Sequence, residues 1–360
     1  MKNNKINIVS PGRTCLFGDH QDYLGLPVIA CAINRHISLE AVKNNTPFFK
    51  IWLPDIGEIR EIRIDQIFKN LKKRDYLASS LRVLRRYDCI PDIGYDITIS
   101  GNLAINAGIS SSSALIVAWI RFLIAAYGIN QEITPLLISG IAHEAEVLEH
   151  GEPGGIMDHY SIGIGNVLYI NTGEKVSYEI IARQLDGLIV GESGVKKETV
   201  EVLGNLKAKA INSIFEIKQK KADFKIELAD MNAYEKYSQY VSPASRPYFY
   251  AALKNHSITR AAISEFKKEK TNIEYIGSLM NDHHKILKEI LKITVPRIDK
   301  MIDNAIDAGA YGAKIVGSGG GGSIIAIAPA HKREKVIEAL LSAGARAAYS
   351  VAVDPGVRII

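Results

Sequence analysis

The sequence is poor in cysteine, and the few that it has form no recognisable pattern. Cys15, Cys31 and Cys89 are odd in number, and their spacings match neither a metal site nor a disulfide framework. So few thiols are typical of a protein from a reducing compartment. We therefore expect a cytoplasmic protein without structural disulfides.

Long apolar runs and a strong charge of one sign are also absent. No stretch approaches the roughly 18 uninterrupted apolar residues of a membrane span, and residues 1–5 lead into a strand-like segment and not a signal peptide. The 44 basic and 39 acidic residues leave a formal net charge of only +5. The basic runs at 69–74 and 218–221 are typical of solvated helix ends and not of a nucleic-acid-binding face. We expect neither a membrane nor a nucleic acid as partner, although a mildly basic surface helps to attract an anionic nucleotide.

What remains is an ordinary globular composition in a long chain. Hydrophobic residues make up 47% and charged residues 23% of the 360. A chain of this length exceeds the roughly 250–300 residues at which a single core stops growing, so two domains are expected.

The apolar periodicity changes near residue 185 and divides the chain. The first part predicts strands at 6–10, 37–42, 49–53, 58–64, 95–100 and 167–171, and helices at 76–86, 112–127 and 135–149. The second part predicts long helices at 198–221, 246–255, 257–268, 275–291, 297–308 and 331–343, with strands at 188–191, 313–316, 323–327 and 348–353. We expect an α+β protein with domains at 1–185 and 186–360.

A segment of small residues and serines at 102–114 lies between a predicted strand and a predicted helix. Small residues let backbone N–H groups approach a ligand, and the first N–H groups of a helix are free to bind an anion. A single serine there could simply cap the helix, but the run Ser110–Ser113 exceeds what a cap needs. We predict phosphate binding by Asn106, Ala107, Gly108, Ser110, Ser111, Ser112 and Ser113.

A glycine run at 317–322 lies between two predicted strands. A hairpin turn does not need so many glycines, so the run indicates close approach to a ligand or to another backbone. It is no Walker A loop, because no Gly-Lys-Ser/Thr follows. It is no dinucleotide fingerprint either, because a strand follows where that motif needs a helix, which argues against a dehydrogenase.

Charged residues gather in two further segments. Arg13, Asp19, His20 and Asp22 follow a strand that is expected to end at residues 11–12, and Asp158 follows a Pro-Gly-Gly turn. A loop aspartate most often caps a turn or is solvated. An Arg–Asp pair from two distant segments could instead give a carboxylate of low pKa beside a phosphate. The residues alone leave both interpretations open.

Together these segments resemble the GHMP kinase superfamily, and its galactokinase branch most closely. Residues 12–25 resemble the sugar-binding signature, 102–114 the phosphate loop, 155–158 the catalytic-aspartate motif and 314–322 the third motif. Segments 279–284 and 309–313 also look like that branch. The resemblance covers nearly the whole chain in the family's order.

The resemblance implies a two-domain fold, with a first domain like ribosomal protein S5 domain 2 and a ferredoxin-like second domain. It also implies that ATP and a sugar bind between the domains. The γ-phosphate would pass to a sugar hydroxyl, expected to be the anomeric one, giving a sugar 1-phosphate and ADP. We expect no partner beyond these small molecules, and a monomer or weak homodimer.

The resemblance also assigns roles to individual residues. Asp158 would be the base, and Arg13 would pair with it and with the transferring phosphoryl group. Mg²⁺ would be held by Ser113 and by Glu146, although Glu146 could also be a plain solvated helix residue like Glu149. The sugar would contact Asp19, His20, Asp22 and Gly155, and ATP would also contact Gly319 and Gly320.

Three departures from the galactokinase pattern affect the expected substrate. Asp19 stands where Glu is usual, residues 104–106 replace Pro-Leu-Gly, and Leu203-Gly204 stand near the position of a sugar-facing Tyr. Residues 149–153 echo the mevalonate kinase branch instead. We therefore expect a substrate bulkier than galactose or different from it near C6. The alternatives are a sugar-acid, heptose or mevalonate-type kinase, and a non-catalytic sugar and ATP sensor on the same fold.

Overall fold

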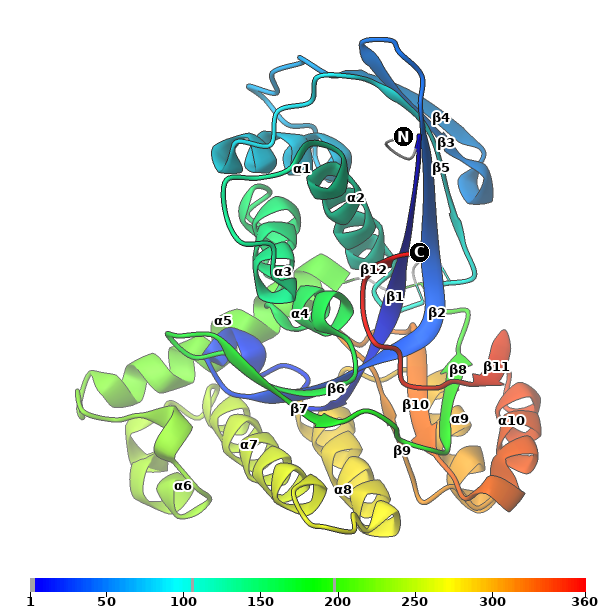
Figure 1. The fold of residues 1–360 in the computed structure, drawn as a ribbon. Coiled ribbons are helices and arrows are strands. Elements are labelled where there is room, and N and C mark those ends of the chain that lie inside the picture. Colours follow the sequence, from blue (N-terminus) through cyan, green and yellow to red (C-terminus); the bar gives the residue numbers. More distant parts are fainter. Residues whose placement is uncertain (1–3, 105–106, 197–198) are drawn as a thin grey trace.

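The structure is a computed structural model that describes residues 4–104, 107–196 and 199–360. The described residues form two sheets with helices packed against them (Figure 1). The first sheet has eight strands in the order β12-β1-β2-β5-β3-β4, with β6 pairing with β2 and β7 with β6. Its strands are β1 (Lys5–Phe17), β2 (Val28–Lys43), β3 (Phe48–Leu53), β4 (Glu58–Arg63), β5 (Tyr95–Gly101), β6 (Val167–Asn171), β7 (Ser177–Ala182) and β12 (Arg358–Ile359).

β1 is longer than the sequence predicted. The expected end at residues 11–12 is wrong, because the strand continues to Phe17 with a register shift between Pro11 and Gly12. Proline lacks the N–H needed for a regular ladder but is tolerated at such a bulge. At Gly12, an added Cβ would lie 2.4 Å from Leu103 Cδ1. Because β1 continues to Phe17, Arg13 lies on a strand and not in a loop.

Four helices cover one face of the first sheet: α1 (Tyr76–Leu84), α2 (Ser111–Tyr127), α3 (Pro135–His143) and α4 (Met157–Ile164) (Figure 1). The helix predicted at 135–149 is α3 followed by a π-helical turn, Glu144–Leu148. We did not predict α4, because the Pro-Gly-Gly sequence before it was taken as a turn. It places Asp158 in the first turn of a helix.

The second sheet is antiparallel, with the strand order β11-β8-β10-β9. These strands are β8 (Leu188–Glu192), β9 (Gly312–Ile315), β10 (Ser323–Ile327) and β11 (Ala347–Ser350). The neighbouring helices α9 (Pro296–Asp307) and α10 (Arg333–Ser342) pack on it through buried apolar side chains. β9 and β10 flank the glycine run.

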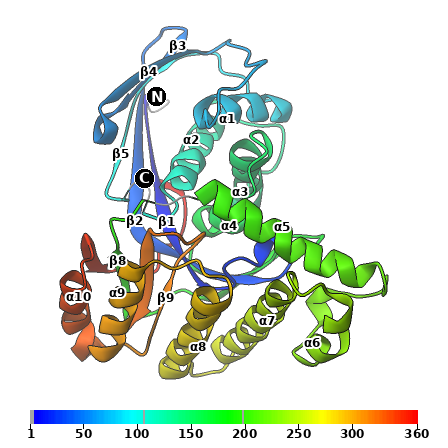
Figure 2. The same cartoon turned by 180° about the vertical axis from the view of Figure 1, so that it is seen from behind.

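Four more of the described helices lie between β8 and α9 in the chain: α5 (Thr199–Lys218), α6 (Asn232–Tyr237), α7 (Arg246–Phe266) and α8 (Ile273–Lys285). In Figures 1 and 2, α5 lies between the helices on the first sheet and the group α6, α7 and α8. The helices predicted at 246–255 and 257–268 are one continuous helix, α7, because no Gly or Pro interrupts it.

The two sheets share a continuous apolar core. Ile8 and Leu39 of the first sheet belong to the same buried cluster as Ile325 of the second. The chain passes from β7 to β8 between residues 182 and 188, and β12 returns to pair with β1. We retain domains at 1–185 and 186–360 as a proposal.

No helix among the described residues is both long and apolar enough to span a membrane.

Candidate active site

A cavity of about 410 Å³ brings together most of the residues predicted to be functional. This volume is typical of a small-molecule site. The predicted residues that line it are Arg13, Asp19, His20, Asp22, Gly108, Ser110, Ser111, Ser112, Ser113, Glu146, Gly155 and Asp158. Ala107, Gly319 and Gly320 are not among its lining residues, and Asn106 lies outside the described part of the chain.

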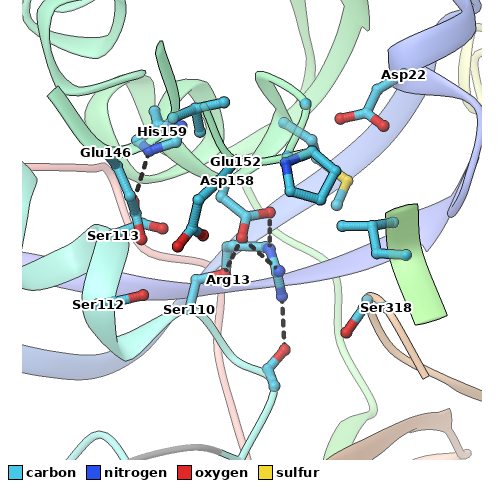
Figure 3. Close-up of a pocket in the computed structure, with 18 of the residues that line it drawn as sticks. Arg13, Asp22, Ser110, Ser112, Ser113, Glu146, Glu152, Asp158, His159 and Ser318 are labelled. Atoms are coloured by element: carbon cyan, nitrogen blue, oxygen red, sulfur yellow. Dashed lines mark hydrogen bonds and ion pairs between the residues drawn. The ribbon is translucent and has the colours of Figure 1, made fainter. Parts of the chain in front are cut away.

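Arg13 and Asp158 form a two-pronged ion pair at the centre of the cavity (Figure 3). Arg13 Nε donates to Asp158 Oδ1 at 2.7 Å, and Nη2 donates to Oδ2 at 2.8 Å. The remaining guanidinium nitrogen, Nη1, donates to Gly108 O at 2.7 Å. A strand residue and a helix residue 145 positions apart thus form one rigid unit.

This pairing controls the ionisation of Asp158. Burial alone would raise the pKa of the carboxyl group, but the charge and hydrogen bonds of Arg13 outweigh burial and lower the pKa to about 2. Ser110 Oγ also donates to Oδ2 at 2.6 Å. Asp158 is therefore ionised throughout the physiological pH range.

Helix α2 begins at the cavity, with Ser110 as its N-cap and Ser111, Ser112 and Ser113 as its first residues. Ser110 has a left-handed backbone, with φ of 61°, and its side chain makes no cap hydrogen bond. The alternative of a simple capping serine is therefore wrong for Ser110, whose hydroxyl bonds to Asp158 instead. Ser111, Ser112 and Ser113 form the first turn, where the N–H groups have no partner within the helix. This is the geometry of an anion site.

Glu146 lies on the π-helical turn, on the same side of the cavity as Ser113 (Figure 3). His159 Nε2 lies 2.7 Å from Glu146 Oε2, so the ring N–H can donate to the carboxylate. Figure 3 shows the Ser113 hydroxyl beside the same carboxylate. The described residues contain no cluster of three or more His, Cys, Asp or Glu side chains that could hold a metal alone. One carboxylate and one hydroxyl nevertheless fit Mg²⁺, which takes its other oxygen ligands from water and phosphates.

Asp22 lies on the other side of the Arg13–Asp158 pair (Figure 3). Burial and the nearby Asp158 charge raise the pKa of Asp22 to about 6. Its carboxylate lies so close to Gly155 that an added Cβ there would be 1.7 Å from Oδ2. Only glycine fits at position 155 without moving Asp22.

Asp19 and His20 contact the start of the glycine run. Asp19 Oδ1 accepts a hydrogen bond from Gly317 N at 2.7 Å, and His20 Nε2 lies 3.2 Å from Ser318 O. The neighbouring Gly319 and Gly320 pack against Ile293. An added Cβ on Gly319 would lie 2.5 Å from Ile293 Cβ, and Gly320 N donates to Ile293 O at 2.7 Å. The phosphate contacts of these two glycines remain a prediction.

Several cavity residues were not predicted: Arg74, Tyr76, Glu152, His159 and Ser318. His159 directly follows Asp158, and this adjacency was the one signal that could have identified it. Arg74 and Glu152 form an ion pair of 2.7 Å between segments 78 residues apart, which no local pattern indicates.

Family models match three parts of the chain. They are the galactokinase galactose-binding signature at residues 2–42, the GHMP kinases N terminal domain at 75–166 and the GHMP kinases C terminal model at 261–346. Together they match well over half of the sequence. The chain belongs to the GHMP kinase family. It is therefore a small-molecule kinase, and the predicted family and two-domain fold are confirmed.

Individual relatives agree with this assignment. The galactokinase of Pyrococcus furiosus is 28% identical over 350 residues, which cover 94% of this GHMP kinase and 93% of the relative. The crystal structure of Lactococcus lactis galactokinase complexed with galactose superposes with a TM-score of 0.87 at 21% identity, covering 99% and 95% of the two chains. Methanococcus jannaschii mevalonate kinase gives a TM-score of 0.71 at 21% identity, covering 98% and 100%. Both structures establish the fold.

Proposed function

We propose that this GHMP kinase transfers the γ-phosphate of ATP to the anomeric hydroxyl of galactose or a related sugar, giving a sugar 1-phosphate and ADP. The observation that carries the proposal is the position of the Arg13–Asp158 pair. It lies between the open N-terminus of α2 on one side and Asp22 on the other (Figure 3). A phosphate and a hydroxyl bound on these two sides would meet at the pair.

The phosphate side is formed by the first turn of α2. The N–H groups and hydroxyls of Ser111, Ser112 and Ser113 would bind the phosphates, helped by the positive end of the helix dipole. Ser113 and Glu146 would hold Mg²⁺, which neutralises phosphate charge when bound. Within this arrangement His159 keeps the Glu146 carboxylate in place through the 2.7 Å contact.

Asp158 would accept the proton of the sugar hydroxyl. A carboxylate with a pKa of about 2 is a weak base while Arg13 holds it. When Arg13 turns part of its charge toward the transferring phosphoryl group, Asp158 loses part of that stabilisation and its basicity rises. Phosphoryl transfer has a loose transition state that depends on positioning and charge neutralisation, so a late proton transfer to a weak base is sufficient.

The sugar side is formed by residues that follow β1 and by Gly155, just before α4. Asp22 would accept hydrogen bonds from sugar hydroxyls, and His20, Gly155 and Asp19 would complete the wall. Leu203 also lines the cavity and gives it an apolar surface. The match to a galactose-binding signature supports a sugar here.

The alternatives are a sugar-acid or heptose kinase, a mevalonate-type kinase and a silent sensor. A mevalonate-type kinase shares this fold, but the match to a galactose-binding signature favours a sugar as substrate. A silent sensor is disfavoured because Arg13, Asp158 and Glu146 all line one cavity. A cytoplasmic location and a monomer or weak homodimer are further proposals.

The test is ADP release with ATP and Mg²⁺ across galactose, galacturonic acid, arabinose, fucose, mannose, heptoses and mevalonate. We expect turnover with at least one galactose-like sugar and none with mevalonate. Turnover with mevalonate alone would contradict the sugar assignment. Sugar and ATP binding without ADP release would identify a sensor.

A further inference from the structure

A lysine side chain is fully buried where the two sheets meet. Lys314 lies on β9 of the second sheet, and its side chain is 0% exposed. Its Nζ donates to Asp19 Oδ2 at 2.6 Å, to Cys15 O at 3.0 Å and to Ile315 O at 2.8 Å. These contacts use all three protons of the ammonium group. A buried ammonium is tolerated only when it is paired and hydrogen-bonded in this way.

The partner carboxylate is held equally firmly. Asp19 Oδ1 accepts the hydrogen bond from Gly317 N, so both of its oxygens are bound to the segment that contains β9 and the glycine run. A second link joins the next residue, since His20 Nε2 lies 3.2 Å from Ser318 O. The turn after β1 is therefore attached at two successive residues to β9 and the glycine run that follows it.

Among the described residues, Asp19 is the carboxylate with which Lys314 forms an ion pair. His283, on α8, is buried and its ring stacks on Phe17. Burial and the charge of Lys314 lower the pKa of His283 to about 3, so its ring is neutral at physiological pH. His284 behaves similarly, with a pKa of about 4. The ammonium group of Lys314 is thus bound by one carboxylate, Asp19, and by two backbone carbonyls.

We infer that Lys314 is a positioning residue that reaches from the second sheet and fixes the turn at residues 18–23, which forms the sugar wall of the cavity. This inference rests on the proposed function for the identity of the ligand. Asp19 then acts chiefly through Lys314 and Gly317, and the side chains placed for the substrate are His20 and Asp22. The left-handed backbone of His20, with φ of 63°, supports this role, because a residue with a side chain needs external contacts to hold it there.

The main test variant is the double substitution Asp19→Asn with Lys314→Met. Removing one partner of a buried pair leaves an uncompensated charge, whereas removing both often leaves stability unchanged. Asp19→Asn alone is the second variant, because it keeps the two backbone carbonyl contacts of Lys314. The matched control is His36→Gln with Asp354→Asn. It removes another largely buried pair, of 2.6 Å, that joins β2 to the C-terminal segment and does not line the cavity.

Two measurements separate positioning from a merely structural role. Hydrogen exchange of the ligand-free protein should be faster by about tenfold or more at residues 18–23 in the double variant, with other regions and the circular dichroism unchanged. The kcat/KM for the best sugar should fall by about 100-fold through a higher sugar KM, with the ATP KM nearly unchanged. The control pair should change neither quantity.

Normal exchange at 18–23 and normal sugar KM in a folded double variant would overturn the role of Lys314. If the double variant does not fold, Asp19→Asn takes its place, and an unchanged sugar KM and exchange rate there would overturn it. If no sugar is a substrate of the unmodified protein, the proposed function fails, and the exchange measurement still decides whether Lys314 holds the turn.

Discussion

Arg13 holds Asp158 through two parallel hydrogen bonds, with Nε 2.7 Å from Oδ1 and Nη2 2.8 Å from Oδ2. The pair lowers the pKa of Asp158 to about 2 and fixes the direction of both side chains. Because Arg13 Nη1 is also bound to Gly108 O, the pair is joined to the loop that leads into α2. Arg13 therefore contacts both the proposed base, Asp158, and the loop that leads into the proposed phosphate site.

Asp158→Asn should abolish most turnover while leaving ATP binding intact. The amide has the same shape, but it cannot accept a proton, so we expect a loss of about 10²–10⁴-fold in kcat. Steady-state kinetics measure the loss, and calorimetry with a non-hydrolysable ATP analogue checks nucleotide binding. Near-normal kcat in a folded variant would remove Asp158 from the role of base.

Gly155→Ala should raise the sugar KM without changing the ATP KM. The new Cβ would lie 1.7 Å from Asp22 Oδ2, so the Asp22 carboxylate must move from its place in the cavity. Gly204→Ala is the matched control, because a Cβ there meets nothing within 4 Å and alanine favours the helix α5. Equal sugar KM values for the two variants would show that the place of Asp22 does not matter for the sugar.

Asp22 should make sugar binding dependent on pH. Its pKa of about 6 means that the carboxylate is protonated below that pH and loses its capacity as a charged acceptor. The sugar KM should therefore rise as the pH falls through about 6, and Asp22→Asn should give a high KM that is flat with pH. A pH-independent sugar KM in the unmodified protein would exclude this role.

Ionisation of Asp22 should favour sugar binding but lower the stability of the fold. The folded state raises the pKa of Asp22 above the ordinary 3.8, so it binds the proton more tightly than the unfolded chain, and the ionised form costs stability above pH 6. Asp22→Asn should raise the free energy of unfolding at pH 7.5, by at most about 3 kcal/mol. The gain should shrink as the pH falls from 6 toward 4. Chemical denaturation at both pH values measures it, and a destabilised variant at pH 7.5 would contradict the prediction.

Plain galactose should be a poorer substrate than a related sugar. Asp19 is one methylene shorter than the usual Glu, and its two carboxylate oxygens are already hydrogen-bonded to Lys314 and Gly317. Leu203 stands near the usual position of the sugar-facing Tyr and lines the cavity, as do Tyr23 and Tyr76. The kcat/KM values across the sugar panel decide the point. A clear preference for galactose would mean that these departures do not affect specificity.

The sequence analysis singled out most of the segments that line the cavity, because glycine runs, a serine-rich helix start and charged turns are local features. The predicted end of β1 was wrong, because Pro11 was taken as a strand end although a bulge accommodates it. The sequence analysis also missed α4, since the Pro-Gly-Gly sequence hid the helix that carries Asp158.

Side-chain pairing between distant segments could not be predicted. Lys314 and Asp19 are 295 residues apart, and no spacing indicates that a lysine on one sheet pairs with a carboxylate after a strand of the other. Gly319 and Gly320 show the same limit. Their sequence indicates a close approach, but only the packing reveals that Ile293 is the neighbour.

The proposed transfer to the anomeric hydroxyl is tested most directly by ³¹P NMR of a reaction with ATP, Mg²⁺ and the best sugar of the panel. We predict that the γ-phosphate signal of ATP is replaced by ADP and by one new phosphomonoester whose phosphorus couples to the anomeric proton of the sugar. The Asp158→Asn variant should leave the ATP signals unchanged over the same time. Loss of the γ-phosphate only to inorganic phosphate, or a product phosphorylated at another position, would contradict the proposed transfer to the anomeric hydroxyl.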